Sequence, residues 1–506
     1  MLFHSVQFMV FLALTLLLYW TVAARRLPRL IVLFLASVVF YSAWMPLPLL
    51  LFAALALIMW QAARAIRRTE SDRTKKIVVG LSVTAFLAIL GVFKYANLFY
   101  STAIDLARLL GRDVAFHRLD WIFPLGISFG VFQAIHYVVD VYRGHISERY
   151  GYWKTLLYLL FFPHLIAGPI VRAPFLLARF DEVPTITKDE AARAIYRIAT
   201  GIAKKLLLAD LLSVGIVDPV FASPTIYTST EVAVAVVAYT FQIYYDFSAY
   251  SDIAIGAAAL FGFKFPENFN KPYVARNLFE FWNRWHMTLS TWLRDYLYFP
   301  LGGSKLGKWK TLRNVMIVMV LGGLWHGAGW RFAVWGFVHG IGLWSVRCYW
   351  WITGHERREP GPFAEDRSRT EKPRPKRSQG PFSSFLRFGE KGPWDLFGTI
   401  AAVAATFTYV VLSRVFFRAS DVSHAVVVFR QLFEGTFGVV NVPNAVWIAL
   451  FFSALLHWLP PSLYDRSARL FVWLPAPARA VALVLLVLSV RQIASFEARP
   501  YIYFQF

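Results

Sequence analysis

Long runs of apolar residues, separated by short polar turns, occupy most of the chain. A helix that crosses a membrane needs about 20 predominantly apolar residues, and runs of about this length recur many times. The pattern predicts an all-α polytopic membrane protein with about 11–13 membrane-embedded helices. Several runs are short or contain Gly and Pro, so re-entrant segments are expected among them. The predicted segments are 5–23, 27–44, 47–66, 77–100, 121–142, 156–170, 232–250, 315–330, 332–352, 396–417, 445–459 and 480–490.

The basic residues in the polar turns alternate along the chain. Arg25, Arg26 and Arg29 follow the first predicted helix, and a basic cluster at 64–76 follows the third. The turn 45–48, between the second and third helices, carries no charge. Because cytoplasmic loops are enriched in Lys and Arg, the alternation predicts an extracytoplasmic N-terminus. The first apolar run has no basic residues before it, so it is predicted to be a retained helix and not a signal peptide.

The composition supports insertion into a membrane and gives no reason to expect a nucleic-acid partner. Hydrophobic residues make up 58% of the 506 positions, above the roughly 45–50% of soluble domains, and the mean hydropathy is +0.50. The net charge is +22, and cytoplasmic loops facing anionic lipids account for it without nucleic acid. Residues 188–210 place basic side chains opposite an apolar face, which predicts an amphipathic helix on the cytoplasmic leaflet of the membrane. Those side chains are Arg193, Arg197, Lys204 and Lys205.

A charged, proline-rich segment interrupts the apolar pattern after residue 353. It has no apolar period, so it is expected to be a flexible linker, and its basic excess places it on the cytoplasmic side. The predicted organisation is a membrane core at 1–353 containing both histidine signatures described below, a linker at 354–395, and further membrane helices of the same domain at 396–506. The single cysteine, Cys348, excludes an internal disulfide and a cysteine metal cluster.

Two aspartates lie inside the apolar, aromatic run YYDFSAYSD. An ionisable side chain at membrane depth must pair or face a polar cavity. Asp246 and Asp252 are therefore interpreted first as structural anchors for arginines such as Arg284 or Arg294, and second as residues that line a substrate path.

Two other polar residues have structural interpretations. The run FFPHLIAGPI contains two prolines and a glycine, which break any helix, and irregular backbone at this depth is expected to border an internal cavity. His164 in this run is predicted to be structural. Ser128 lies in a G-x-S-x-G sequence, but this motif needs a strand-to-helix turn. Within a membrane helix, Gly126 and Gly130 instead provide a packing face.

The stretch 277–299, NLFEFWNRWHMTLSTWLRDYLYF, has the pattern of one helix. Asn277 can cap it, Glu280 completes a capping-box pattern, and Pro300 stops it. His286 falls on the apolar, tryptophan-rich face. A lone buried histidine can be a satisfied core residue or a functional one, and this pattern alone does not decide between them.

A second histidine, His326, lies in LGGLWHGAGW among four glycines and two tryptophans. Small residues allow close helix packing, and they also leave room for a substrate beside the ring. The sequence alone leaves both interpretations open, close helix packing and room for a substrate. Because the histidines are scattered and no HExxH, HxxxH or P-loop sequence occurs, neither a bound metal nor nucleotide-driven transport is expected.

Several of these sequences together resemble the membrane-bound O-acyltransferase (MBOAT) family. The matching stretches are YYDFSAYSDIAIG, PENFNKPY, FWNRWHMTLSTWLRDYLYFPLGG, LGGLWHGAGW and the terminal YIYFQF, and FFPHLIAGPI also fits. The similarity is greatest to the bacterial alginate O-acetylation branch, which is related to the teichoic-acid D-alanylation membrane protein. It extends over nearly the whole chain, apart from the long linker.

The resemblance implies a ring of membrane helices around a central tunnel in the bacterial inner membrane. It also implies that His326, in the WHG signature, and His286, in WHMTLS, are catalytic. His326 is expected to act as general base, while His286 positions the donor, stabilises an oxyanion or holds a proton. Tunnel residues expected with less support are Trp285, Trp325, Asp246, Arg294 and Asp295.

The implied reaction moves an acyl group, with acetyl as the leading choice, from a cytoplasmic thioester donor to a hydroxyl of a polysaccharide such as alginate. The donor is acetyl-CoA or an acyl carrier protein, acting as co-substrate, and no permanently bound cofactor is expected. An extracytoplasmic SGNH-type acetyltransferase or another polysaccharide-modifying protein is the expected partner.

Three alternatives remain open at this point. One is D-alanyl or other acyl transfer to a cell-envelope glycan. Another is an exporter whose histidines only relay protons, which inverted repeats would support. The third is a non-catalytic membrane anchor for a periplasmic acetyltransferase.

Overall fold

A computed structural model describes residues 1–112, 114–115, 119, 124–354, 393–493 and 500–502. These residues form helices joined by turns, and no strand occurs among them. Contacts divide the chain into two units. Of the described residues, unit 1 comprises Met1–Ile198 and Tyr250–Pro266, and unit 2 comprises Ala199–Ala249 and Glu267–Ile502. The boundaries predicted at 353 and 395 stay a prediction, and most of the expected linker lies outside the described residues.

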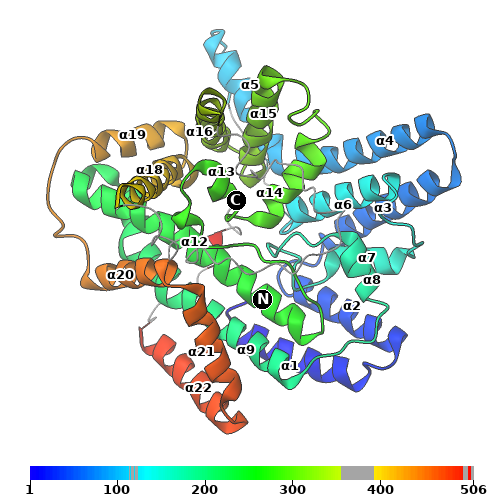
Figure 1. Ribbon diagram of the computed structural model, residues 1–506. Coiled ribbons are helices and arrows are strands. Elements are labelled where there is room, and N and C mark those ends of the chain that lie inside the picture. The colour runs from blue at the N-terminus through cyan, green and yellow to red at the C-terminus, as the bar shows by residue number, and fades with distance from the viewer. Residues whose placement is uncertain (113, 116–118, 120–123, 355–392, 494–499, 503–506) are drawn as a thin grey trace. The chain divides into compact units, whose positions relative to one another are not determined.

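Unit 1 contains the helices of the N-terminal part of the chain. Within it α3, α4 and α6 pack side by side (Figure 1). Its helices are α1 (Val6–Thr21), α2 (Arg26–Ser42), α3 (Leu49–Arg68), α4 (Asp72–Leu90), α5 (Ala96–Leu109), α6 (Ile127–Tyr142), α7 (Tyr152–Leu160), α8 (Ala173–Arg179) and most of α9 (Lys188–Ala203), with a π-helical turn η1 (Gly91–Tyr95) between α4 and α5.

Unit 2 contains both histidine signatures and the helices beyond the linker. Its long helices are α15 (Lys308–His326), α16 (Trp330–Thr353), α18 (Pro393–Arg418), α20 (Asn444–Trp458), α21 (Pro461–Trp473) and α22 (Ala476–Ile493). The shorter elements are η2 (Lys204–Ala209), α10 (Asp210–Leu212), η3 (Ser213–Val217), α11 (Asp218–Ala222), η4 (Pro224–Ile226), η5 (Pro272–Val274), α13 (Leu278–Trp282), α14 (Met287–Leu293), η6 (Arg294–Tyr298) and α19 (Val422–Leu432).

One long helix, α12 (Ser229–Leu260), contributes to both units. It is apolar on all sides, which is typical of a helix enclosed by protein, and 83% of its most apolar window is buried. It carries Asp246 and Asp252, the two aspartates that the sequence singled out.

Four helical segments in the described residues are long and apolar enough to cross a membrane. They are Leu49–Arg68, Asp72–Leu109, Ser229–Leu260 and Phe397–Arg418. The pair α20 and α21, bent by 95°, would be a fifth if it forms one span. Shorter apolar helices are Val6–Thr21, Ile127–Tyr142, Val422–Leu432 and Ala476–Val490. The helical, polytopic membrane class predicted from the sequence is confirmed, while the count of 11–13 helices and the central tunnel stay predictions.

The amphipathic helix predicted at 188–210 differs from expectation in two ways: α9 ends at Ala203, where the π-helical segment η2 begins, and Lys205 is buried. Lys205 is 1% exposed and does not lie on a solvent-facing basic surface. Its Nζ pairs with Asp210 at 2.8 Å and with Asp246 at 2.7 Å. The carboxylates compensate the buried ammonium, so helical spacing alone assigned this lysine to the wrong face.

The irregular segment 161–170 has the predicted break. Helix α7 ends at Leu160, no helix forms before α8, and the segment is buried throughout. His164 Nε2 donates to the Tyr158 carbonyl at 2.9 Å, and its ring stacks on Phe265 at 5.7 Å. These contacts fit the structural role predicted for His164, while the cavity expected here stays a prediction.

Ser128 also sits in a packing environment. Gly126, in the left-handed region with φ +81°, precedes α6, and a Cβ at Gly130 would lie 2.8 Å from the Phe52 ring. The Ser128 hydroxyl accepts from Lys94 Nζ at 3.4 Å. Among the described residues no strand leads into this segment, whereas a nucleophile elbow needs a strand-to-helix turn.

Candidate active site

His286 lies in a break between two short helices, so the prediction of one continuous helix over 277–299 is wrong. Helix α13 ends at Trp282, α14 begins at Met287, and His286 has φ 44° and ψ 53°. The predicted cap is confirmed, because Asn277 Oδ1 accepts from Glu280 N at 2.9 Å. The Glu280 carboxylate accepts from Arg276 N at 2.9 Å, one residue before the position that a capping box would use.

The break is held by a segment that precedes it in the chain. Asn270 N donates to the Arg284 carbonyl, and Met287 N donates to the Asn268 carbonyl, each at 2.9 Å. These bonds replace the helical bonds that the break removes. The left-handed conformation costs a non-glycine residue about 1–2 kcal/mol, so His286 adopts it only because its surroundings impose it.

Asn268 also determines which nitrogen of His286 carries a proton. His286 Nδ1 lies 3.0 Å from Asn268 Oδ1. The same Oδ1 accepts from Thr288 N at 3.3 Å and from Thr288 Oγ1 at 2.9 Å. Because a backbone N–H donates to it, this atom is the amide oxygen, and His286 Nδ1 must donate to it. The neutral ring therefore has its lone pair on Nε2.

His286 is completely buried in unit 2 and lies outside the candidate spanning helices. Its ring packs edge-on against Phe247, with centroids 4.7 Å apart. Burial lowers the pKa of His286 to about 3, because the charged ring would lose its hydration. The imidazole is therefore neutral at physiological pH.

His326 is the last residue of α15 and is 4% exposed. Three aromatic rings surround it, with centroids 5.1 Å away at Trp325, 5.4 Å at Trp335 and 5.3 Å at Phe417. Trp325 also lies 6.4 Å from the His286 ring. The structure thus brings the two predicted histidines to the same tryptophan, although 40 positions separate them in the sequence.

The glycines before His326 divide between the two roles left open by the sequence. A Cβ on Gly323 would lie 2.2 Å from the Phe332 carbonyl oxygen, so Gly323 permits the close crossing of α15 and α16. Gly322 instead lines a pocket with His326. The packing role is therefore confirmed at Gly323, while room for a substrate beside the ring stays a prediction.

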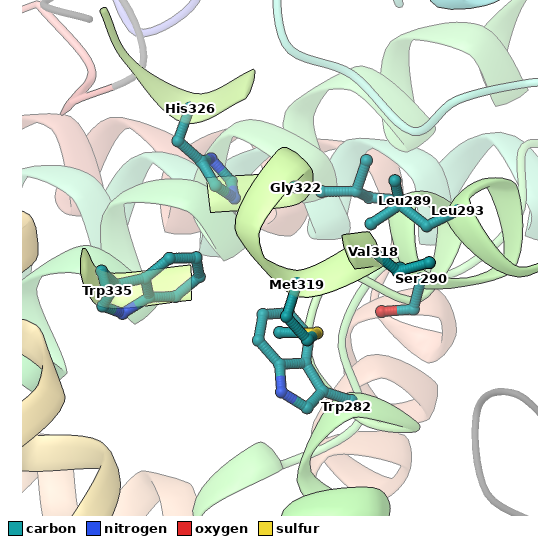
Figure 2. A pocket seen from close by; sticks show the side chains of 9 residues that line it. All are labelled: Trp282, Leu289, Ser290, Leu293, Val318, Met319, Gly322, His326 and Trp335. Carbon is teal, nitrogen blue, oxygen red and sulfur yellow. The ribbon is translucent and has the colours of Figure 1, made fainter. Parts of the chain in front are cut away.

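The pocket beside His326 is small and almost entirely apolar. Its cavity volume is about 10 Å³, about the space that one water molecule occupies. Figure 2 shows His326 and Trp335 on one side of it, with Gly322, Leu289 and Leu293 across from them and Trp282 and Met319 below. Ser290 and Val318 complete the lining. Such walls disfavour water, which would compete with a hydroxyl acceptor for an activated acyl group.

The residues predicted with less support to line a tunnel have different surroundings in the structure. Trp285 and Trp325 are 1% and 5% exposed and pack near the histidines. Asp246, expected to pair with Arg284 or Arg294, instead binds Lys205 and accepts from Ile502 N at 2.8 Å. Asp252 pairs with Arg197 at 2.9 Å. These partners come from distant sequence positions, which the local pattern could not reveal.

Arg294 and Asp295, the other two predicted tunnel residues, bind each other. Arg294 Nε donates to Asp295 Oδ1 at 2.8 Å in η6, and neither residue lines the pocket. Arg284 binds Glu280 at 2.7 Å. The catalytic and substrate-path roles of the residues named from the sequence stay predictions.

Three buried polar residues near the histidines were missed. Asn268 binds His286, and His339 Nε2 lies 3.0 Å from Ser413 Oγ with its ring 4.7 Å from Trp335. Arg414 stacks on Trp285, with Cζ 4.3 Å from the ring centroid. The available signal was a polar residue within an apolar run, as at Arg414 in the predicted segment 396–417.

The described residues contain no group of three or more His, Cys, Asp or Glu arranged to hold a metal ion. The expectation that the protein has no metal and no permanently bound cofactor stays a prediction.

Comparison with known proteins identifies the family. Residues 36–352 match MBOAT, the membrane-bound O-acyltransferase family. The chain belongs to this family. The match includes both histidine signatures. As an MBOAT member, the chain is an integral, multi-pass membrane O-acyltransferase, as the sequence predicted.

Several relatives with assigned names are similar to this MBOAT chain. The probable alginate O-acetylase AlgI of Azotobacter vinelandii is 41% identical over 347 residues, 68% of this chain and 68% of that protein. The peptidoglycan O-acetyltransferase of Helicobacter pylori is 34% identical over 63% of this chain and 64% of its own length. The teichoic acid D-alanyltransferase of Streptococcus thermophilus is 33% identical over 43% of this chain and 55% of its own length.

Proposed function

We propose that this O-acyltransferase moves an acetyl group from a cytoplasmic thioester donor toward a hydroxyl of an extracellular polysaccharide such as alginate. The donor is acetyl-CoA or an acetylated carrier protein, and the membrane is the bacterial inner membrane. The alginate O-acetylase relatives support this acceptor. Acetyl is favoured over D-alanyl because the acetylase relatives match at higher identity and over more of the chain.

The observation that carries the mechanism is His326 at the wall of an apolar pocket. A hydroxyl attacks a thioester poorly until its proton is removed, and histidine can accept a proton near neutral pH. In the proposed step His326 takes the hydroxyl proton as the oxygen bonds to the acyl carbon. The carbon–sulfur bond then breaks, and the proton passes to the leaving thiolate, which departs as a thiol.

The tautomer of His286 argues against one of the three roles that the resemblance implied for it. With the proton on Nδ1 and bound to Asn268, the neutral ring has no N–H at Nε2 to give to an oxyanion. Nε2 is instead a proton acceptor. We therefore assign His286 to proton holding or donor positioning beside Trp325, and not to oxyanion stabilisation.

A partner completes the proposed pathway outside the membrane. An SGNH-type acetyltransferase is the expected protein to receive the acetyl group and pass it to the polymer. Direct transfer to the polymer is the other route, and the same intramembrane chemistry serves both.

The test uses inside-out membrane vesicles that contain this protein and its polysaccharide. Acetyl-CoA labelled in the acetyl group is supplied at the cytoplasmic face, and ester-linked label on the polymer is measured. We expect label to accumulate, and vesicles lacking the protein provide the blank. Failure with acetyl-CoA and acetyl carrier protein, together with transfer of D-alanine from a D-alanyl carrier protein, would overturn the assignment.

A further inference from the structure

Three arginines gather in unit 2 where α18 ends, α16 begins and α11 passes. Arg414 and Arg418 lie on α18, and Arg331 lies in the first turn of α16. Together with Tyr239 of α12 we call them the arginine cluster. Arg331 Nη1 donates to the Phe417 carbonyl at 3.3 Å, which ties α16 to α18 at this point.

Arg414 is the most deeply buried of the three, with 1% exposure. Its guanidinium lies between Trp285, Trp335 and Phe417, with Cζ at 4.3, 5.8 and 5.6 Å from their ring centroids. No described residue accepts a hydrogen bond from its Nε or its Nη2. Aromatic faces offset part of the cost of burying the charge, but unpaired N–H groups remain expensive.

Another buried arginine in this chain shows how protein carbonyl groups can satisfy the N–H groups of a buried guanidinium. Arg29, also 1% exposed, donates to the carbonyls of Ala23, Phe180 and Glu182 at 2.6, 3.1 and 2.8 Å. Arg414 lacks such a set of carbonyl acceptors. A bound acceptor group would satisfy the N–H groups of Nε and Nη2, which the protein leaves open.

Tyr239 adds a second open polar group. It is 1% exposed, and its hydroxyl has no hydrogen-bond partner among the described residues. Phe221 links it to Arg418, since the ring lies 6.0 Å from Tyr239 and 5.5 Å from Arg418 Cζ. Arg418 has a carboxylate partner, Asp218 at 2.7 Å.

The arginine cluster adjoins the catalytic histidine. Trp335 and Phe417 contact both the His326 ring and the Arg414 guanidinium. A group bound at Arg414 would therefore lie against two of the rings that surround His326.

The topology predicted from the sequence places the cluster on the acceptor side. Helix α16 runs from Arg331 to the linker, and α18 runs from the linker to Arg418. With the linker cytoplasmic, Arg331 and Arg418 lie toward the outside, where basic residues are disfavoured. The thioester donor approaches from the opposite side.

We propose that the arginine cluster binds the negatively charged group of the acyl acceptor, an acidic glycan carrying carboxylates or phosphates. Arg414 binds the anionic oxygens directly, and Arg418 and Arg331 raise the local positive potential. Because guanidinium groups pair well with such oxygens, the site selects an acidic acceptor and places its hydroxyl beside His326. This inference rests on the proposed function for the identity of the reaction, and on its direct route, in which the polymer itself is the acceptor; the binding can be measured without either.

The test measures binding without acyl transfer, so its failure is separate from failure of the proposed function. Full-length protein in nanodiscs is titrated with a uronic acid oligosaccharide and with the same oligosaccharide after reduction of its carboxyl groups. We expect tighter binding of the acidic form, weakened by salt. Arg414→Gln should weaken acidic binding about 10- to 100-fold and leave the neutral form unchanged, and Arg414→Lys should restore part of the loss.

Controls separate recognition from folding. Arg430→Gln removes one exposed charge from α19 and should bind as wild type does. Arg418→Gln, at a half-exposed position, replaces the Arg414 variant if the latter fails to accumulate. A glycerol phosphate oligomer that binds more tightly, with the same loss in Arg414→Gln, would assign the anion to phosphate. Equal binding of acidic and neutral oligosaccharides, or equal loss of both in the variants, would overturn the proposal.

Discussion

At the scale of single residues, Asn268 controls the geometry of His286. Its Oδ1 receives three donors, from His286 Nδ1 and from the Thr288 backbone and hydroxyl. The same residue therefore fixes the ring tautomer and stabilises the chain break in which His286 adopts a left-handed conformation. Asn268 is a positioning residue, because it acts through His286.

Substitutions at Asn268 should reveal this role through the pH dependence of activity. Asn268→Ala removes the acceptor and should lower transfer about tenfold or more, by analogy with other residues that orient a functional histidine. Asn268→Asp keeps an acceptor and adds a negative charge, which favours the protonated ring and raises the pKa of His286 above its value of about 3.

The measurement is the pH profile of acyl transfer in membranes. If neutral His286 is the active form, the acidic limb of the profile should move to higher pH in Asn268→Asp. A lower rate with an unmoved limb would mean that Asn268 serves only to hold the fold.

At the scale of helices, the crossing of α15 and α16 presents His326. A Cβ on Gly323 would collide with the Phe332 carbonyl, and one on Gly336 would lie 2.2 Å from the Met319 carbonyl. Because both obstacles are backbone atoms, a side chain cannot move aside to relieve the clash. His326 is thus positioned by two glycines that let the helices meet.

Gly323→Ala should therefore destabilise this crossing by about 1–3 kcal/mol, the usual cost of overpacking. We expect a lower thermal unfolding temperature in detergent and a lower membrane level, measured by fluorescence-detected chromatography. Gly398→Ala in α18 is the matched control, since nothing lies within 4 Å of its added Cβ. Equal stability of the two variants would contradict the packing role of Gly323.

The helices also show what the sequence could predict. Local signals identified the Asn277 cap and the break after Leu160, because caps and prolines act within a few residues. The break at His286 was missed because Asn268 imposes it from outside the helical pattern. The partner of Asp246 was missed for the same reason, since Lys205 lies 41 positions away. Arg414 was overlooked because one charge barely changes the hydropathy of segment 396–417.

At the scale of the whole molecule, the orientation in the membrane rests on the alternation of basic turns. The linker, nearly all outside the described residues, joins α16 to α18, and both of these helices belong to unit 2. Because the two ends of the linker return to the same unit, its side of the membrane also fixes the side on which Arg331 and Arg418 lie.

Cysteine labelling tests this orientation. In a Cys348→Ala background, Ser378→Cys should react with a membrane-impermeant maleimide only after the cells are opened. A cysteine at Ser5, ahead of the first predicted basic turn, should react from outside and serves as the positive control. Labelling of Ser378→Cys in intact cells would reverse the orientation and with it the acceptor-side placement of the arginine cluster.

The central claim is that His326 is the general base of acyl transfer. The most direct test is to measure the ester content of the polysaccharide made by cells carrying His326→Ala. A strain lacking the protein is complemented with wild type, His326→Ala or His145→Ala, an exposed histidine in unit 1, and membrane levels are measured in parallel. Loss of a general base typically costs about 10² to 10⁴ in rate. We predict that His326→Ala accumulates normally and leaves the polymer essentially unacylated, while His145→Ala matches wild type. A polymer acylated to the wild-type level by His326→Ala would contradict the mechanism.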